Sequence, residues 1–162
     1  MKFKAVAVAL ILFVLSLSIS SAPNSSAAFD SLKGLAGQWQ LKDPSGKQQI
    51  VTWKVVSGGS AMMESLQEES MVTMYHVDKG HLMLTHYCAA QNQPRMLGTV
   101  SDDGKTFTFD FLDATNLASP NDGHMHKMVL TIQDKDHFTE QWVFSKDGKN
   151  DEHGVFQFTR KK

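Results

Sequence analysis

Beyond about residue 35, hydrophobic and polar residues alternate along most of the chain with a period of two. This alternation is typical of strands with one buried face, because successive side chains of a strand point to opposite sides. Short segments rich in glycine, aspartate, asparagine and serine separate the alternating runs and indicate turns. The pattern predicts ten strands, at residues 36–42, 47–56, 61–67, 70–77, 81–88, 96–101, 105–112, 124–133, 137–145 and 154–160.

The pattern predicts little helix. Phe29, Leu32 and Leu35 recur at a spacing of three, which indicates one or two helical turns before the first strand. A long antiparallel meander either stacks as two sheets or closes on itself, and closure removes the unpaired edges. We therefore expect an all-β fold, a ten-stranded antiparallel meander closed into a barrel behind a short N-terminal helical turn.

The register of each hairpin follows from the pairing that gathers apolar residues on one face. A three-residue loop at 78–80 places Val72, Met74 and His76 opposite His86, Leu84 and Leu82. Residues 134–136 form the corresponding loop between the strands that carry the histidine pair and Glu140. The inner face predicted in this way includes Trp53, Met62, Glu64, Met74, His76, Leu84, His86, Phe107, Phe109, Phe111, His124, His126, Met128, Glu140 and Trp142.

The meander also predicts which end of the barrel carries function. Tight turns gather at one end, whereas the longer segments 89–95, 113–122 and 145–154 gather at the other. Rigid scaffolds usually carry their sites on such loops, and barrel mouths are common ligand sites. Arg95 lies in one of these loops, where it is able to bind a ligand carboxylate or to brace the loop.

Histidines on the predicted inner face raise the question of a metal. His86, His124 and His126 are candidate zinc ligands, because neutral imidazole nitrogens bind zinc, and Glu64 or Glu140 would be a fourth ligand or orient an imidazole. Their strands lie three places apart, roughly 14 Å around the wall. The alternative is that these histidines line a wet cavity and hydrogen-bond to water, to Glu64 or to a ligand.

Two glutamates on an apolar face are unusual, because a lone buried charge is expensive. If Glu64 and Glu140 both face inward, the cavity is amphipathic and suits a ligand with a polar group on an apolar body. A glutamate with a raised pKa would also serve as a general acid, but no nucleophile motif accompanies the pair. Enzymatic activity therefore stays open, with binding favoured.

The N-terminal sequence predicts export. Lys2 and Lys4 precede an apolar run that ends near Leu17, and small residues follow, so residues 1–27 read as a signal peptide with cleavage after Ala27 or Ala28. Of the 16 basic and 17 acidic residues, cleavage removes only Lys2 and Lys4, which leaves a net charge of −3. This balance disfavours nucleic acid, and a membrane beyond the signal peptide, as a partner. Residues 28–162 have the length of one domain, and the single cysteine excludes an internal disulfide.

The first and last predicted strands carry Gly37-x-Trp39 and Arg160. This pair resembles the barrel closure of the calycins, the lipocalins and fatty-acid-binding proteins, in which a late arginine packs across the tryptophan. The resemblance implies a calycin-type barrel with an internal ligand pocket.

Segments 71–96, 109–117 and 124–128 also resemble a family of small exported bacterial proteins with no established activity. Two groups of calycins offer comparisons for the chemistry. Periplasmic zinc-binding lipocalin-like proteins use a His-x-His pair with a further histidine, which implies zinc at His86, His124 and His126. Nitrobindin-like proteins bind haem, which implies an axial ligand such as His76 or His124.

Together these observations predict an exported protein that binds a small molecule in an amphipathic pocket. The expected pocket residues are Trp53, Glu64, His76, His86, Arg95, His124, His126, Glu140 and Trp142. A zinc protein is the first alternative and a haem protein the second. A further functional class is a structural or partner-binding module, whose interior would be filled with side chains.

Overall fold

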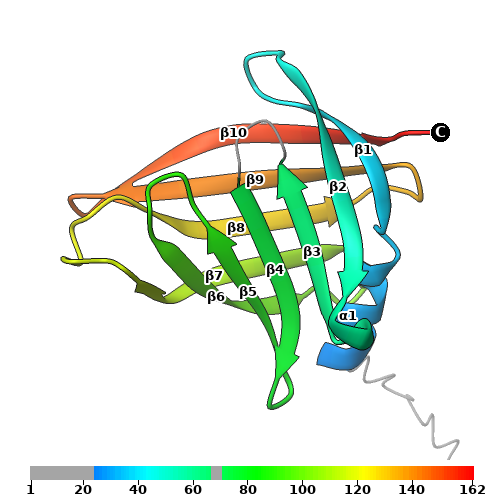
Figure 1. Ribbon diagram of the computed structural model, residues 1–162, viewed down its shortest axis with the longest axis horizontal. Helices are drawn as coiled ribbons and strands as arrows, with labels where there is room; N and C mark the ends of the chain where they lie inside the picture. The colour runs from blue at the N-terminus through cyan, green and yellow to red at the C-terminus, as the bar shows by residue number, and fades with distance from the viewer. Residues whose placement is uncertain (1–23, 67–70) are drawn as a thin grey trace, which may run out of the picture.

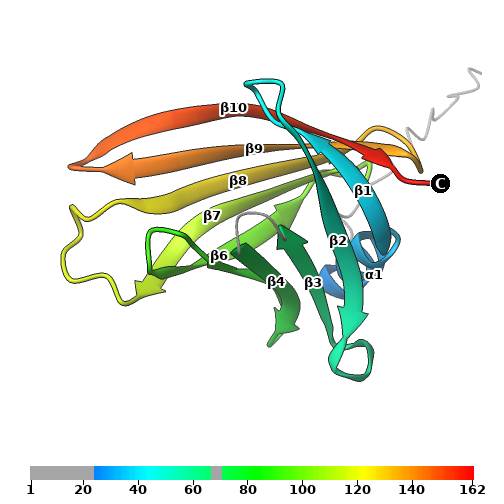
Figure 2. The same ribbon diagram turned by 45° about the horizontal axis from the view of Figure 1, so that its top comes forward.

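The computed structural model describes residues 24–66 and 71–162 and forms a closed antiparallel barrel (Figures 1 and 2). Each strand pairs with its neighbours in sequence, and pairing of the first with the last closes the barrel. The predicted ten-stranded fold is confirmed. Its strands are β1 (Gly37–Lys42), β2 (Gln48–Val56), β3 (Ala61–Leu66), β4 (Met71–Asp78), β5 (His81–Tyr87), β6 (Gln93–Val100), β7 (Thr106–Thr115), β8 (His124–Ile132), β9 (His137–Lys146) and β10 (Lys149–Arg160).

One helix, α1 (Ser25–Lys33), precedes the barrel, where the apolar spacing predicted helical turns. The side chain of Asn24 caps its N-terminus by accepting a hydrogen bond from the amide of Ala27. Phe29 and Leu32 are buried in the core, and the helix packs against β4 and β5. Figure 1 shows α1 across the barrel end where β2 meets β3, so this end is closed.

The closing pair of strands positions Trp39 and Arg160 opposite each other. Trp39 is fully buried, and its indole N–H donates to the carbonyl of Leu35 at 2.8 Å. The Arg160 guanidinium lies over the Trp39 ring. Gly37 is required beside them, because it has a φ of 138° and a Cβ there would lie 2.9 Å from Arg160 Nη1. The predicted packing of Arg160 across Trp39 is therefore present.

The register predicted for the β4–β5 hairpin is wrong by one residue. The turn contains only Lys79 and Gly80, whose φ values of 47° and 82° suit a two-residue hairpin turn. Thr73 pairs with His86 and Tyr75 with Leu84. The inward residues of β4 are therefore Thr73 and Tyr75, and His76 lies on the other face.

The predicted β8–β9 register holds for Met128 and Trp142 but changes nearer the mouth of the barrel. A bulge lies between Met125 and Lys127, so Met125 pairs with Phe144. An extra residue reverses the alternation of inward and outward side chains. Met125 therefore takes the inward position that simple alternation assigns to His124 and His126.

The segment 145–154 is not the long loop that was predicted. Strands β9 and β10 continue into a tight hairpin around Asp147 and Gly148, whose φ values are 52° and 70°. The pairing shifts between Glu152 and Val155, and Gly154 has a φ of 79°. This longer β10 brings Asp151 and His153 beside the barrel mouth.

The described helix is too short to span a membrane, and no stretch of described residues forms a helix that would. Most of the predicted signal peptide lies outside the described residues, so residues 1–27 remain a prediction in that role. The described helix begins at Ser25, two residues before the first of the predicted cleavage points.

Candidate functional site

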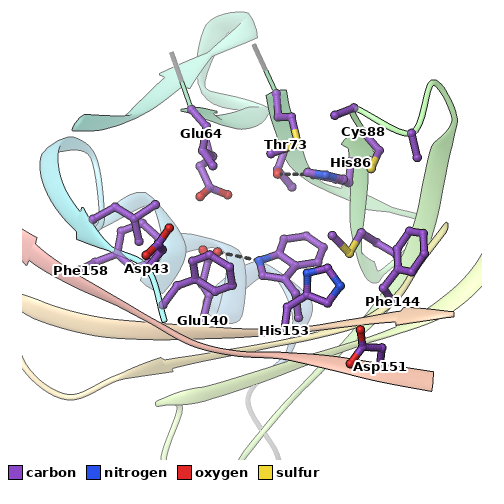
Figure 3. Close-up of a pocket in the computed structure, with 18 residues that line it drawn as sticks. Asp43, Glu64, Thr73, His86, Cys88, Glu140, Phe144, Asp151, His153 and Phe158 are labelled. Carbon is purple, nitrogen blue, oxygen red and sulfur yellow. Dashed lines mark hydrogen bonds between the residues drawn. The ribbon is translucent and has the colours of Figure 1, made fainter. Parts of the chain in front are cut away.

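A cavity of about 610 Å³ lies inside the barrel, at the end opposite α1 (Figure 3). Residues of the β1–β2 turn, the β5–β6 connection and β10 surround its mouth, in agreement with the end expected to carry function. Its volume lies within the range of small-molecule sites. Much of its wall is apolar and includes Leu41, Leu66, Met125, Trp142, Phe144 and Phe158.

Below the cavity the barrel is filled. Trp53 stacks on Tyr75 with ring centres 5.1 Å apart, and Phe138 packs edge-on against both Trp39 and Trp53. Trp53, predicted as a pocket residue, is therefore part of this core and does not line the cavity. The aromatic layer forms a rigid floor between the cavity and α1.

Two glutamates meet at the floor of the cavity. Glu64 comes from β3 and Glu140 from β9 on the opposite wall, and Figure 3 shows their carboxyl groups pointing toward each other. They are only 1% and 2% exposed. Glu64 Oε2 accepts from the Tyr75 hydroxyl at 2.9 Å, and Glu140 Oε2 accepts from the Trp142 indole at 3.0 Å.

The second oxygen of each carboxyl group lacks a partner. Oε1 of Glu64 and Oε1 of Glu140 are buried without a well-aligned hydrogen bond among the described residues. Buried polar atoms are normally satisfied, so each such atom calls for an explanation. Both residues line the cavity.

The environment of the pair favours protonation. Burial raises the pKa of Glu64 to about 7, against which hydrogen bonds with Tyr75, Thr73 and Glu140 act. Burial, and then the charge of Glu64, holds the pKa of Glu140 well above its usual range. Two close carboxyl groups resist double ionisation, so near neutral pH the pair holds at least one proton. Burial and the neighbouring carboxylates also raise the pKa of Tyr75, which keeps its hydroxyl a donor.

His86 forms the polar side of the wall on β5. Its Nδ1 lies 3.0 Å from the hydroxyl of Thr73, and its ring is tilted against that of Trp142 at 4.8 Å. Nε2 is buried without a hydrogen bond from any described residue. Burial lowers the pKa of His86 to about 4, so the imidazole is neutral.

Acidic groups surround the mouth. Asp43 lies in the β1–β2 turn, and Asp151 and His153 lie on β10 near the rim. The pKa of Asp43 is lowered first by the hydroxyl of Ser45 and also by backbone amides of its turn, so this carboxyl is ionised. No lysine or arginine is among the described residues that line the cavity. The site is therefore acidic from its mouth to its floor.

Of the predicted pocket residues, Glu64, His86, Glu140 and Trp142 line the cavity, but His76 and Arg95 do not. His76 pairs with Met83 on the outward side of β4, because the hairpin turn is one residue shorter than predicted. Arg95 forms a bidentate ion pair with Asp113 on the surface, in which Nε lies 2.6 Å from Oδ1. It lies outside because its neighbour Met96 takes the inward position.

His124 and His126 also lie away from the cavity lining. Their nearest nitrogens are 3.3 Å apart, and both rings pack against Phe111. The His124 Nδ1 lies 2.8 Å from the carbonyl of Asp122. The bulge in β8 accounts for this placement, because it directs Met125 into the cavity.

The three histidines predicted as zinc ligands are therefore not assembled. Within residues 24–66 and 71–162, no group of three or more histidine, cysteine or acidic side chains is arranged to hold a metal ion. The residues also do not fit haem, because an acidic cavity without lysine or arginine in its described wall repels haem propionates. His76 and His124, the expected axial ligands, lie outside the lining.

Several wall residues were missed by sequence reasoning, namely Asp43, Thr73, Asp151 and His153. Thr73 was assigned to the wrong face with the rest of β4. Asp151 and His153 were assigned to a loop, although the Asp-Gly pair at 147–148 is a strong signal for a tight hairpin. That signal predicts paired strands through both residues.

Comparison with known proteins shows the fold and no more. No family model matches the chain, and no curated protein matches it. The crystal structure of Rv2717c from M. tuberculosis superposes with a TM-score of 0.53 over 83% of this chain and 98% of that chain. The two sequences are 16% identical, so the similarity is one of barrel architecture.

Proposed function

We propose that this protein binds a small organic molecule, with an apolar body and a polar head group, inside the barrel. The observation that carries the proposal is the open cavity of about 610 Å³ with an apolar wall and buried polar atoms at its floor. A structural module would fill this space with side chains, because protein interiors are close-packed. The head group would lie at Glu64 and Glu140, and the body against the aromatic wall.

The calycin resemblance is consistent with this role. The contact of Trp39 with Arg160 is the closing feature that the resemblance implies, and proteins of that class hold ligands inside the barrel. The separation of His86 from the other two histidines gives the zinc alternative no support, and the acidic lining gives none to haem.

Export is part of the proposal and rests on the sequence of residues 1–27. Secretion from bacterial cells followed by measurement of the intact mass would test it. Loss of 27 or 28 residues is the expected result, and retention of the whole N-terminal segment would contradict export.

Binding is tested with Nile red, a neutral dye whose fluorescence increases in apolar surroundings. We expect saturable binding of one dye per protein. Met125→Trp fills the cavity and abolishes the signal, whereas Val129→Trp, on the outer side of the same strand, leaves it unchanged. Absence of saturable binding, or equal binding by the Met125→Trp protein, would refute the proposal.

A further inference from the structure

The carboxyl groups are the only fixed charges among the described residues that line the cavity. Four carboxyl groups line it, two at the floor and two near the mouth, and no described lysine or arginine is in its wall. The two histidines of the wall, His86 and His153, are the remaining basic groups. A ligand with a carboxylate or phosphate would find no fixed positive charge there, whereas a cation would be attracted from the mouth inward.

The described residues supply few hydrogen-bond donors to the two carboxyl groups at the floor of the cavity. Tyr75 and Trp142 each donate to one oxygen of the glutamate pair, and the other two oxygens are left without a well-aligned donor. A protonated amine carries up to three N–H donors and a positive charge in a small volume. It would donate to the carboxyl pair and replace the proton that the two groups otherwise share.

His86 supplies an independent indication of a ligand. It is 3% exposed and lines the cavity, and its Nε2 is buried without a hydrogen-bond partner among the described residues. Because Nδ1 lies beside the Thr73 hydroxyl, which can donate to it or accept from it, Nε2 is free to accept from or donate to a bound molecule. Three residues with unpaired buried atoms, one each from β3, β5 and β9, therefore line the same cavity.

We propose that the cavity binds a monovalent organic amine, with its ammonium group between Glu64 and Glu140 and its apolar body against the wall near Trp142 and Phe158. This inference rests on the proposed binding function and names the chemical class of the ligand. Aromatic rings in the wall add a favourable environment for a cation. A bare metal ion is a poor occupant, because the described side chains supply no set of three ligands.

Proton release should accompany amine binding. Glu64 is faced by Tyr75 from β4, His86 from β5 and Glu140 from β9, while Asp43, Asp151 and His153 surround the mouth. A cation at the pair favours the ionised carboxyl groups, so amine affinity rises as pH rises through the range in which the free pair is protonated. The ammonium itself stays charged, because its ordinary pKa lies near about 10.

The test compares three competitors that share one apolar chain and differ in head group, namely decylamine, decan-1-ol and decanoate. Each is used to displace Nile red. We expect decylamine to compete about tenfold more strongly than the alcohol, which is the advantage of a charge-assisted contact, and decanoate to compete least. Between about pH 6 and about pH 8, the affinity for decylamine should increase several-fold and that for the alcohol should stay constant.

Matched variants locate the effect. Glu64→Gln and Glu140→Gln retain the shape of the side chains and should abolish the preference for the amine, while Glu152→Gln, exposed on β10, should retain it. Nile red binding reports in each case that the variant is folded. Equal competition by amine and alcohol, or stronger competition by decanoate, would overturn the amine inference while leaving the binding function intact. Failure of the wild-type protein to bind Nile red would remove both.

Discussion

The guanidinium carbon of Arg160 lies 4.1 Å from the centre of the Trp39 ring, at the point where the last strand joins the first. The same group donates through Nη1 to the carbonyl of Ala36 and through Nη2 to that of Gly34. One planar cation thus covers a buried tryptophan and links the β1 entry to β10. The joint depends on a shape that lysine does not have.

We therefore predict that Arg160→Lys lowers the free energy of unfolding by about 2 kcal/mol, because the stacked contact and the two carbonyl bonds are not reproduced together. Urea unfolding followed by tryptophan fluorescence measures the change. Lys161→Ala, an exposed neighbour, is the control and should have little effect. Equal stability of the Arg160→Lys and wild-type proteins would show that the joint does not depend on the guanidinium.

The buried carboxyl pair should make the ligand-free protein less stable in alkali. A carboxyl group whose pKa is raised on folding binds more protons in the folded state, so stability falls as pH rises above its unfolded value. Burial raises the pKa of Glu64 from 4.5 to about 7. The loss of stability should therefore begin at about pH 4.5 and continue through about pH 7 and above.

Glu140→Gln should flatten this dependence and stabilise the protein by about 2 kcal/mol at about pH 8. The neutral amide would replace a carboxyl group whose ionisation is opposed by burial and by the charge of Glu64. Melting temperatures across the pH range give the slope. His86 acts in the opposite direction, since its lowered pKa means that stability falls as pH drops below its unfolded value of about 6.5. An unchanged alkaline slope in Glu140→Gln would show that the pair is not the cause.

Tyr75→Phe tests the hydroxyl that donates to Glu64. Its loss removes a 2.9 Å hydrogen bond from a fully buried carboxyl group. We expect destabilisation by about 1–2 kcal/mol and a further increase in the pKa of Glu64. Stability at two pH values distinguishes these effects, because the cost should be larger above about pH 7, where the bond acts on a carboxylate. A cost independent of pH would mean that the hydroxyl does not interact more strongly with the ionised form of Glu64.

His124 and His126 should act independently of His86 toward metal ions. The pair lies at Phe111, and His86 lies in the cavity wall on β5. We therefore expect any zinc affinity measured by calorimetry to fall in His124→Ala and to change by less than about twofold in His86→Ala, because the two sites share no contact. A large loss in His86→Ala would indicate that the three histidines act together.

The barrel could be predicted from the sequence because the signals for strands and turns are local and repeated. Alternation along each strand and turn residues between strands suffice for the number and order of strands, and Gly37, Trp39 and Arg160 identify the closing pair. Glu64 and Glu140 were likewise placed inward, because they stand in register with buried residues on both sides. These predictions required only the period of a strand.

The departures from the predicted site arise from single residues. One residue fewer in the turn at Lys79 exchanged the faces of β4, and one residue more in β8 removed His124 and His126 from the wall. A one-residue change reverses every side chain beyond it, and the apolar composition of both faces of β4 offered little to distinguish them. Met74 is apolar but lies on the outer face of β4, so hydrophobicity alone assigned the outer face to the interior.

The covered end of the barrel has a consequence for kinetics. Since α1 and the aromatic floor close that end, a molecule in the cavity must leave by the opening through which it entered. Carboxylates at a rim change mainly the association rate of a charged ligand, so Asp43 and Asp151, at the opening, would act on the speed of capture. Glu64 and Glu140, at the floor, would act mainly on the residence time. The dwell time of a bound molecule and its speed of capture can therefore be altered separately, at two depths of one passage.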